Sequence, residues 1–393
     1  MSTTEPGKVR FGIVGLGNMG LFHVDSFANL PGAELTAICD ASDVNLKRAG
    51  AKTSAKPFTD WHQMLDSKLI DAVLIATPHF LHVPIALAAF DRDIHVLCEK
   101  PLAVTVGQGR AVVEAAEKKP ELKFGLMFQM RTTALYRTLR GLIVDGELGE
   151  ISRITWIVTD WFRTWTYFAS GGWRATWAGE GGGVLINQCP HNLDLIQWLT
   201  GLTPNRITAV GFVGKTHPIE VEDEVSAILE YPTGAIGHFI TSTGEAPGTN
   251  RLEIVGDRGK IVAEGGKITF TRTKKSVKQV RETSPEAFAV VDTWEINIPI
   301  PAGQPEGHKI VTENFANAIL RNEALVAPGI DGLRELELGN AIAMSALTRQ
   351  SLTLPLDAAA YDRFIDQMKK QYGGRKTLKA DPNAVSDISK SFR

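Results

Sequence analysis

Lys100 is the residue with the clearest chemical potential, and it stands in the segment Glu99-Lys100-Pro101 after a short apolar run. The proline disfavours helical backbone at Lys100 and holds the residue extended. A lysine with a lowered pKa beside a hydride acceptor can take the proton of an alcohol or return it. A loop lysine is also commonly a solvated charge, so its role depends on whether a hydride acceptor binds nearby.

A glycine-rich segment near the amino terminus predicts such an acceptor. An apolar run leads into the fingerprint Gly15-Leu16-Gly17-Asn18-Met19-Gly20. Gly15 allows a tight turn, Gly17 lets the backbone approach a pyrophosphate, and Gly20 lets the next helix pack closely. The start of that helix offers N–H groups and a partial positive charge to the phosphates. The segment therefore predicts dinucleotide binding.

Asp40 indicates which dinucleotide binds. It closes a second apolar run, 20 residues after Gly20, where a carboxylate can accept both hydroxyls of the adenosine ribose. Its charge would repel the 2′-phosphate of NADP, so we expect NAD. Lys47 and Arg48 lie one or two helical turns further on, and they leave use of NADP open.

A second constellation follows the glycine triplet 181–183. Pro190 is typical of the first turn of a helix, and that helix would end at Gly201. His191 and Asp194 would lie one turn apart on one face, with Asn187 just upstream, so that the three could point into one cleft. In the alternative interpretation, Asn187 caps the helix and His191 is a core histidine.

Aromatic and basic side chains are concentrated between the two constellations. The aromatic segment, residues 156–177, holds five of the eight tryptophans together with two arginines: Trp156, Trp161, Arg163, Trp165, Tyr167, Trp173, Arg174 and Trp177. Indole faces pack well on the C–H surface of sugar or cyclitol rings, while arginine bonds the hydroxyls. Packing in the core or at a subunit interface is the alternative.

The elements that must position these residues divide the chain in two. Short β-branched runs alternate with helical patterns at first, and they predict a parallel sheet with the strands Val9–Val14, Leu35–Cys39, Ala72–Thr77, Val96–Cys98 and Phe124–Phe128. Later runs separated by turn residues predict a meander. They are Ile151–Asp160, Arg206–Val213, Val225–Tyr231, Ala235–Thr241, Leu252–Val255, Lys260–Val262 and Ile268–Arg272.

The predicted fold class is therefore α/β, with an amino-terminal Rossmann domain and a carboxy-terminal α+β domain that has a large, mostly antiparallel open sheet. We place the domains at residues 1–130 and 131–372. The polar tail 373–393 is expected to be disordered or to wrap a neighbour. One face of the open sheet needs a cover, which predicts a homodimer or homotetramer.

Parallel sheets bind ligands at the carboxyl ends of their strands. Thr77, Pro78 and His82 follow the third predicted strand, Glu99 and Lys100 follow the fourth, and Gln129 follows the fifth. We expect these residues to lie around the cofactor.

Composition excludes several partners. The net charge of −2 implies no broad basic surface, so neither nucleic acid nor an anionic membrane is expected as a partner. The three cysteines show no spacing typical of metal ligands, and we expect no metal site. The amino terminus lacks an apolar signal region, and no stretch has the ~20 apolar residues that span a bilayer. We expect a cytoplasmic protein.

Taken together, these segments resemble the glucose-fructose oxidoreductase / inositol dehydrogenase / rhizopine catabolism family. Glu-Lys-Pro combined with the His-x-x-Asp segment is the most specific feature. The resemblance implies the two-domain fold above and a nicotinamide-dependent oxidation or reduction of one secondary hydroxyl of a sugar, sugar derivative or cyclitol. It also implies that Lys100 and His191 handle the proton and bind the substrate.

One departure from the family pattern concerns Asn187 and Cys189, where many cyclitol dehydrogenases of the family carry Asp and Gly. An amide cannot take up a proton, so an aspartate–histidine relay is not expected. Asn187 can still orient a substrate hydroxyl.

We therefore expect an NAD-dependent dehydrogenase that oxidises a secondary hydroxyl of a sugar, pyranoside or cyclitol. Lys100 or His191 takes the proton. The ring is held by Asn187, Asp194, Arg163, Trp165, Tyr167, Trp173 and Arg174. Two alternatives stay open: an NAD-dependent, redox-neutral glycoside hydrolase, and a non-catalytic cofactor-sensing regulator. The presence of both Lys100 and His191 argues against the regulator.

Overall fold

The computed structural model describes residues 7–379. Its amino-terminal part is a six-stranded parallel sheet in the order β3-β2-β1-β4-β5-β6. The strands are β1 (Val9–Val14), β2 (Ala33–Cys39), β3 (Lys56–Phe58), β4 (Ala72–Ile75), β5 (His95–Cys98) and β6 (Phe124–Leu126). The connecting helices are α1 (Asn18–Ser26), α2 (Asp43–Gly50), α3 (Trp61–Asp66), α4 (His82–Phe90) and α5 (Val106–Glu117). This order confirms the Rossmann domain.

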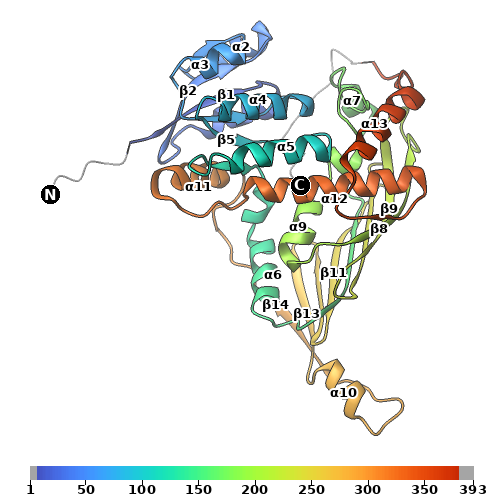
Figure 1. The fold of residues 1–393 in the computed structure, drawn as a ribbon. Coiled ribbons are helices and arrows are strands. Elements are labelled where there is room, and N and C mark those ends of the chain that lie inside the picture. Colours follow the sequence, from blue (N-terminus) through green and yellow to red (C-terminus); the bar gives the residue numbers. More distant parts are fainter. Residues whose placement is uncertain (1–6, 380–393) are drawn as a thin grey trace, which may run out of the picture.

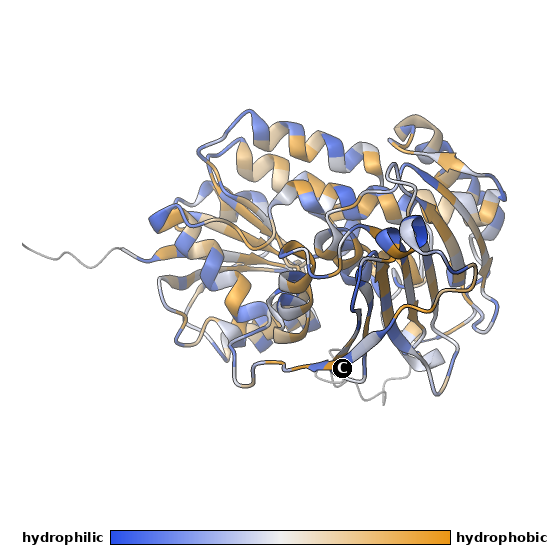
Figure 2. Ribbon diagram, turned by 90° about the horizontal axis from the view of Figure 1, so that it is seen from below, coloured by the Kyte–Doolittle hydropathy of each residue, from blue (hydrophilic) through white to orange (hydrophobic). Residues whose placement is uncertain are grey.

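Burial explains why these segments form strands. The short strands β4 and β5 are almost entirely buried, as strands covered by helices on both faces must be (Figure 2). The sequence analysis missed β3 because this strand has three residues, includes Pro57 and is largely exposed. The sequence analysis also placed the ends of two strands too late. The strand that begins at Ala72 ends at Ile75, and the strand that begins at Phe124 ends at Leu126.

The second part is a nine-stranded sheet in the order β14-β13-β12-β11-β7-β10-β9-β8-β15. Its strands are β7 (Ile151–Val158), β8 (Arg206–Val213), β9 (Glu222–Glu230), β10 (Ile236–Ser242), β11 (Asn250–Gly256), β12 (Gly259–Glu264), β13 (Lys267–Thr273), β14 (Thr293–Ile298) and β15 (Leu352–Thr353). Only β7 and β10 pair in parallel. The predicted open, mostly antiparallel sheet is therefore confirmed.

Helices lie along one side of this sheet and between the two domains (Figure 1). They are α6 (Ala134–Val144), α7 (Trp165–Ala169), α8 (Val184–Asn187), α9 (Pro190–Thr200), α11 (His308–Arg321), α12 (Gly329–Thr348) and α13 (Ala358–Tyr372). The predicted helix from Pro190 is confirmed, and it ends at Gly201 in the left-handed conformation, φ 68°. None of the helices within residues 7–379 is long and apolar enough to cross a membrane.

The two domains share late segments of the chain. Val311, Phe315 and Ala316 of α11 belong to the core that surrounds β1, and Leu336 of α12 belongs to the core under β4 and β5. A boundary at residue 130 therefore leaves out a part of the chain that completes the Rossmann core. Helix α12 packs against α5 and β6 of the Rossmann domain and against α9, β8 and β9 of the second domain.

The described part of the tail differs from the expectation of a disordered or neighbour-wrapping segment. The backbone N–H of Gly374 donates to Glu220 (2.8 Å), and Lys376 Nζ donates to the carbonyls of Arg174 (2.7 Å) and Gly171 (3.2 Å). Residues 373–379 thus return to the aromatic segment of their own chain. The remainder of that prediction falls on residues 380–393, outside the described residues.

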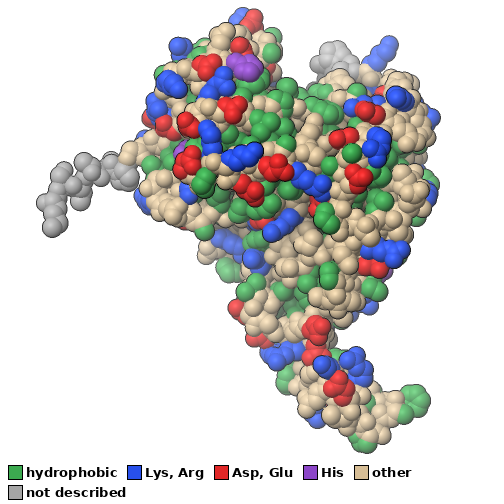
Figure 3. All heavy atoms as spheres, in the orientation of Figure 1, with side chains coloured by type: hydrophobic (Ala, Val, Ile, Leu, Met, Phe, Trp, Pro, Cys, Tyr) green, Lys and Arg blue, Asp and Glu red, His purple; other side chains and the backbone are tan. Residues whose placement is uncertain are grey.

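A projecting arm carries α10 (Val277–Thr283) between β13 and β14. Figure 3 shows it extending from the body, with hydrophobic side chains toward its tip. Phe288 is 95% exposed there, and Val290 is also exposed. The face in Figure 3 otherwise mixes lysine and arginine with aspartate and glutamate, without a basic patch.

Candidate active site

The glycine-rich loop joins β1 to α1 at the carboxyl edge of the parallel sheet. Gly15 has φ +91°, and a Cβ there would lie 2.6 Å from the carbonyl oxygen of Ala76. A Cβ on Gly20 would lie 1.8 Å from the carbonyl oxygen of Gly15. Gly17 instead has open space beside it and precedes α1 without a side-chain cap. Asn18 and Met19 form the first turn, so this loop can admit an anionic ligand at the start of α1.

Asp40 lies beside this loop at the end of β2. Its Oδ2 accepts from the backbone N–H of Leu16 (2.7 Å), and its Oδ1 accepts from that of Ser42 (2.8 Å). The carboxylate therefore connects the second strand to the glycine loop.

His82 braces the ends of β4 and β5 from inside the protein. Its Nδ1 lies 2.7 Å from the carbonyl oxygen of Pro101, and its Nε2 lies 2.9 Å from that of Thr77. Because both ring nitrogens are engaged and the residue is buried, His82 supports the residues around it. The Thr77 hydroxyl, next to Pro78, is buried with no hydrogen-bond partner among the described residues. An unpaired hydroxyl at this edge fits a bound ligand.

Glu99 forms a buried pair with His23, a residue that the sequence analysis did not single out. Glu99 Oε1 lies 2.7 Å from His23 Nε2, and Glu99 Oε2 accepts from the backbone N–H of Lys100 (3.2 Å). Burial opposes ionisation, but the hydrogen bond and charge of His23 outweigh it and lower the Glu99 pKa to about 2. The available signal for His23 was a histidine three residues after the last fingerprint glycine.

Lys100 follows at the end of β5 and reaches across to the second domain. Its Nζ donates to the backbone carbonyl of Asn187 (2.7 Å) and forms no ion pair within the described chain. Burial lowers the pKa of this amine, against the attraction of Glu99 and other carboxylates. This amine therefore releases its proton at a lower pH than an exposed lysine does.

His191, in the first turn of α9, lies against Gln129 of the short helix η2 (Gln129–Thr132). The two Nε2 atoms are 3.0 Å apart. His191 Nδ1 is buried without a hydrogen-bond partner within residues 7–379. Burial and the nearby Lys100 lower the pKa of His191 well below its ordinary value. The imidazole is therefore neutral, with Nε2 in contact with an amide.

Asp194 does not join this group. Arg131 Nε donates to Asp194 Oδ2 (2.8 Å), and Arg131 Nη1 donates to Asp331 (2.8 Å). Both Arg131 and Asp194 are buried. One turn of helix separates His191 from Asp194, but the carboxylate packs against η2 and α12. It occupies a structural ion pair, contrary to the expected contact with the substrate.

Asn187 belongs to a closed polar ring beside Lys100, and both ends of its amide are occupied. Its Oδ1 accepts from the Tyr167 hydroxyl (3.2 Å), and its Nδ2 donates to Glu180. Arg174 Nη1 donates to the Tyr167 oxygen (2.8 Å) and lies 3.7 Å from Glu180. Asn187 therefore does not cap α9, whose N-cap is Cys189. These bonds use one of its two N–H donors and one lone pair of its oxygen.

Glu180 is the second residue that the sequence analysis missed. It is buried, accepts from the backbone N–H of Ala175 (2.6 Å) and bonds to Asn187. Burial raises its pKa, although Arg174 opposes that effect. Its signal in the sequence is an acidic residue directly before the glycine triplet. Glu180 thus supplies a carboxylate beside Asn187.

The aromatic segment divides into core and exposed residues. Trp156 and Trp177 are fully buried in the core of the second domain, as the alternative interpretation held for part of the segment. Trp165 is 59% exposed. Trp173 packs edge-on against His79, and Arg174 lies over both Trp173 and Tyr167. Only the middle of the segment therefore offers a surface to a ligand.

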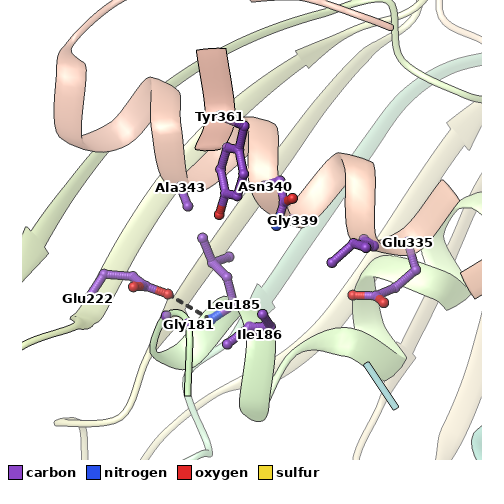
Figure 4. A pocket seen from close by; sticks show the side chains of 11 residues that line it. Gly181, Leu185, Ile186, Glu222, Glu335, Gly339, Asn340, Ala343 and Tyr361 are labelled. Atoms are coloured by element: carbon purple, nitrogen blue, oxygen red, sulfur yellow. Dashed lines mark hydrogen bonds between the residues drawn. The ribbon is translucent and has the colours of Figure 1, made fainter. Parts of the chain in front are cut away.

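A small cavity lies behind α8 and is distinct from the Lys100 site. Glu222 and Glu335 face it from opposite sides, and the Tyr361 ring lies beside it (Figure 4). Glu222 Oε1 accepts from Gly183 and Leu185 N–H groups, at 2.8 and 3.2 Å. The cavity volume is about 10 Å³, at the limit of what one water molecule needs. It cannot hold a sugar ring.

Comparisons with known proteins agree with this geometry. The model of the oxidoreductase family with an NAD-binding Rossmann fold matches residues 9–125, and that of the GFO/IDH/MocA C-terminal domain matches residues 136–262. Levoglucosan dehydrogenase of Pseudarthrobacter phenanthrenivorans is 27% identical over 396 residues, covering 88% of this chain and 98% of that protein. Inositol 2-dehydrogenase of an Arthrobacter species is 32% identical over 238 residues, 58% of this chain and 65% of that protein.

Among solved structures, the WlbA dehydrogenase of Bordetella pertussis in complex with NADH and UDP-GlcNAcA has a TM-score of 0.75 and 29% identity. The match covers 89% of this chain and all of that one. With the sheet order, the glycine loop and the Glu-Lys-Pro strand end in place, the chain belongs to the glucose-fructose oxidoreductase / inositol dehydrogenase / rhizopine catabolism family and is an oxidoreductase with an NAD-binding Rossmann domain.

Proposed function

We propose that the protein oxidises a secondary hydroxyl of a sugar, pyranoside or cyclitol with NAD. The observation that carries this proposal is the Lys100 amine. It lies at the carboxyl end of β5, has a pKa lowered by burial, and is bonded to a backbone carbonyl without a carboxylate partner. An amine with a lowered pKa in that position is suited to take a hydroxyl proton during hydride transfer.

The residues at the sheet edge fit NAD. The open space at Gly17 and the uncapped start of α1 suit the pyrophosphate, and Asp40 suits the adenosine ribose. The unpaired Thr77 hydroxyl and the backbone beside Pro78 would line the nicotinamide half. When bound, the nicotinamide supplies the hydride acceptor. His82 and Glu99 act behind this layer by fixing the strand ends, and Gln129 contacts His191.

We assign the proton transfer to Lys100. Its Nζ has one carbonyl partner and keeps its remaining capacity for a substrate hydroxyl. His191 is neutral, but its Nε2 already contacts the Gln129 amide, which argues against His191 as the group that takes the proton. We assign to His191 a hydrogen bond to the substrate instead. As the C–H bond breaks, the hydroxyl proton passes to Lys100 Nζ. Water then removes that proton between turnovers.

The named relatives support the substrate class. They act on levoglucosan and inositol, and the WlbA structure holds a nucleotide-linked sugar acid. In this chain, the exposed Trp165 and the Tyr167–Arg174 pair offer a ring face and hydrogen-bond donors next to Lys100. A six-membered ring rich in hydroxyls fits that combination.

We further propose that the protein is a homodimer or homotetramer. Apolar residues are exposed on the face of the large sheet that points away from the helices, namely Val210, Phe212, Ile228 and Ile236. They alternate along their strands with buried residues. Phe212→Asp should shift the mass measured by light scattering toward the monomer. A monomeric wild-type protein would refute this proposal.

The experiment that tests the dehydrogenase is NAD reduction, followed at 340 nm, across cyclitols, free sugars and methyl pyranosides. Each reaction is run with NAD and with NADP. We expect turnover of one ring class and a preference for NAD. Glycoside cleavage without net NADH formation would instead support the redox-neutral hydrolase. Binding of NAD with no turnover of any kind would support the cofactor-sensing regulator.

A further inference from the structure

Two arginines flank Tyr167 in the middle of the aromatic segment. The guanidinium carbon of Arg163 lies 5.1 Å from the centre of the Tyr167 ring, and that of Arg174 lies 4.6 Å from it. Tyr167 in turn bonds to Asn187, whose backbone carbonyl accepts from Lys100. Tyr167 and Asn187 therefore connect both arginines to the amine that we assign to proton transfer.

Arg163 has no ion pair within the described part of the chain. Its Nη1 donates to the backbone carbonyl of Phe162 (3.0 Å), while its Nε is buried without a partner among residues 7–379. Stacking near Trp161 and Tyr167 holds the guanidinium in place. A guanidinium carries five N–H donors, so most of this one's hydrogen-bonding capacity is unused.

The neighbouring carboxylates have partners other than Arg163. Glu180 accepts from the Ala175 N–H and the Asn187 amide and lies 3.7 Å from Arg174. Asp160 accepts from Asn250 (3.1 Å) and forms no ion pair with Arg163. Glu99 faces His23 on the other side of the site. Arg174 thus already has a carboxylate neighbour in Glu180, at 3.7 Å, whereas Arg163 forms no ion pair among residues 7–379.

We propose that the substrate ring carries an anionic substituent, a carboxylate or a phosphate, which Arg163 binds with help from Arg174. Planar guanidinium groups match both anions through paired N–H donors. The ring would lie along Tyr167 and Trp165, with its reacting hydroxyl at Lys100 and its anionic group at Arg163. The inference rests on the proposed dehydrogenase and names its substrate class more narrowly.

Matched pairs of ligands test the inference directly. Methyl α-D-glucopyranoside, its 6-carboxylate counterpart (the methyl glucuronoside) and its 6-phosphate differ only at the anionic position. The same three forms are prepared in the galacto series. Binding to the NAD-loaded protein is measured by calorimetry and NADH formation at 340 nm, so that binding and turnover are read separately.

The variants are Arg163→Gln, Arg163→Lys and the control Arg92→Gln. Arg92 pairs with Asp66 after the end of α4, at the opposite edge of the parallel sheet. We expect at least one anionic glycoside to bind ten times more tightly than its neutral partner. Arg163→Gln should remove that advantage, Arg163→Lys should keep part of it, and Arg92→Gln should leave it unchanged. The carboxylate and phosphate arms identify the preferred anion.

Equal binding of the neutral and anionic members would overturn the inference, as would no binding of any anionic member at millimolar concentration. An anionic preference that survives in Arg163→Gln would also overturn it. The proposed function fails in a different way. Selective, Arg163-dependent binding without NADH formation would contradict the dehydrogenase and leave the anion site standing. Turnover of neutral glycosides alone would support the dehydrogenase and contradict the anion site.

Discussion

Cationic side chains lie at two places near α9, and the two places differ in whether carboxylates balance the charge. Under the helix, Arg131 is buried and bonded to two carboxylates, Asp194 and Asp331. Around Tyr167, neither Arg163 nor Lys100 forms an ion pair in the part of the chain that the structure describes, and each donates to a backbone carbonyl. A buried charge without a partner is costly, so it is retained where a ligand or a reaction uses it. Pairing therefore separates the structural cluster from the functional one.

Removal of the unpaired amine should give the largest effect on activity. Lys100→Met keeps the apolar stem but removes the proton acceptor, and loss of general base catalysis costs roughly 10²–10⁴-fold in rate. We expect kcat to fall by about that factor, while the urea midpoint of unfolding stays within error of wild type. A variant with full activity would remove Lys100 from the chemistry.

The paired cluster should respond in the opposite way. Asp194→Ala leaves the buried Arg131 with one carboxylate fewer, and breaking a buried pair costs about 3–5 kcal/mol. We expect the urea midpoint to fall sharply, with the KM of the folded enzyme little changed. Asp66→Ala, which breaks an exposed pair with Arg92, is the matched control and should leave the urea midpoint close to that of wild type. A large rise in KM without loss of stability would place Asp194 in the substrate site after all.

The pH dependence should sharpen the assignment to Lys100. Its amine accepts a proton only above its pKa, so kcat/KM should rise with pH and level off below the usual lysine range, because burial lowers that pKa. Glu180 raises the pKa of Lys100 through its charge. Glu180→Gln should therefore move the rising limb to lower pH. An unmoved limb would show that Glu180 does not act on the titrating group.

The smallest expected effect concerns Lys376, which lies after α13 and bonds to the aromatic segment. Lys376 bonds the carbonyls of Gly171 and Arg174, and a typical hydrogen bond contributes about 0.5–1.5 kcal/mol. Lys376→Ala should raise KM about threefold and leave kcat unchanged. Lys379→Ala, three residues on, serves as the control. A change in kcat alone would contradict a role in positioning Arg174.

Local patterns were sufficient to predict the Rossmann domain and the open sheet. The glycine spacing, the buried strands and Asp40 all depend on residues close in sequence, and the helix from Pro190 to Gly201 was predicted for the same reason. Short or edge elements such as β3 and β14 carry too weak an apolar pattern to be found this way.

The site was harder to predict because its side chains form hydrogen bonds and ion pairs with residues distant in sequence. Asp194 shares a helix with His191, yet its partner Arg131 comes from 63 residues away. The amide of Asn187 bonds to Tyr167 and Glu180, which lie 20 and 7 residues away in the sequence. Glu180 and His23 were missed because a single acidic or histidine residue carries no periodic signal.

Chemical rescue tests the central claim most directly. Lys100→Ala leaves a gap where the amine stood, and small primary amines such as methylamine can enter it. Our account predicts that NADH formation, lost in the variant, returns in proportion to the concentration of the neutral amine, while wild type and Lys100→Met do not respond. If the variant binds NAD and substrate but no amine restores turnover, Lys100 is not the group that takes the hydroxyl proton.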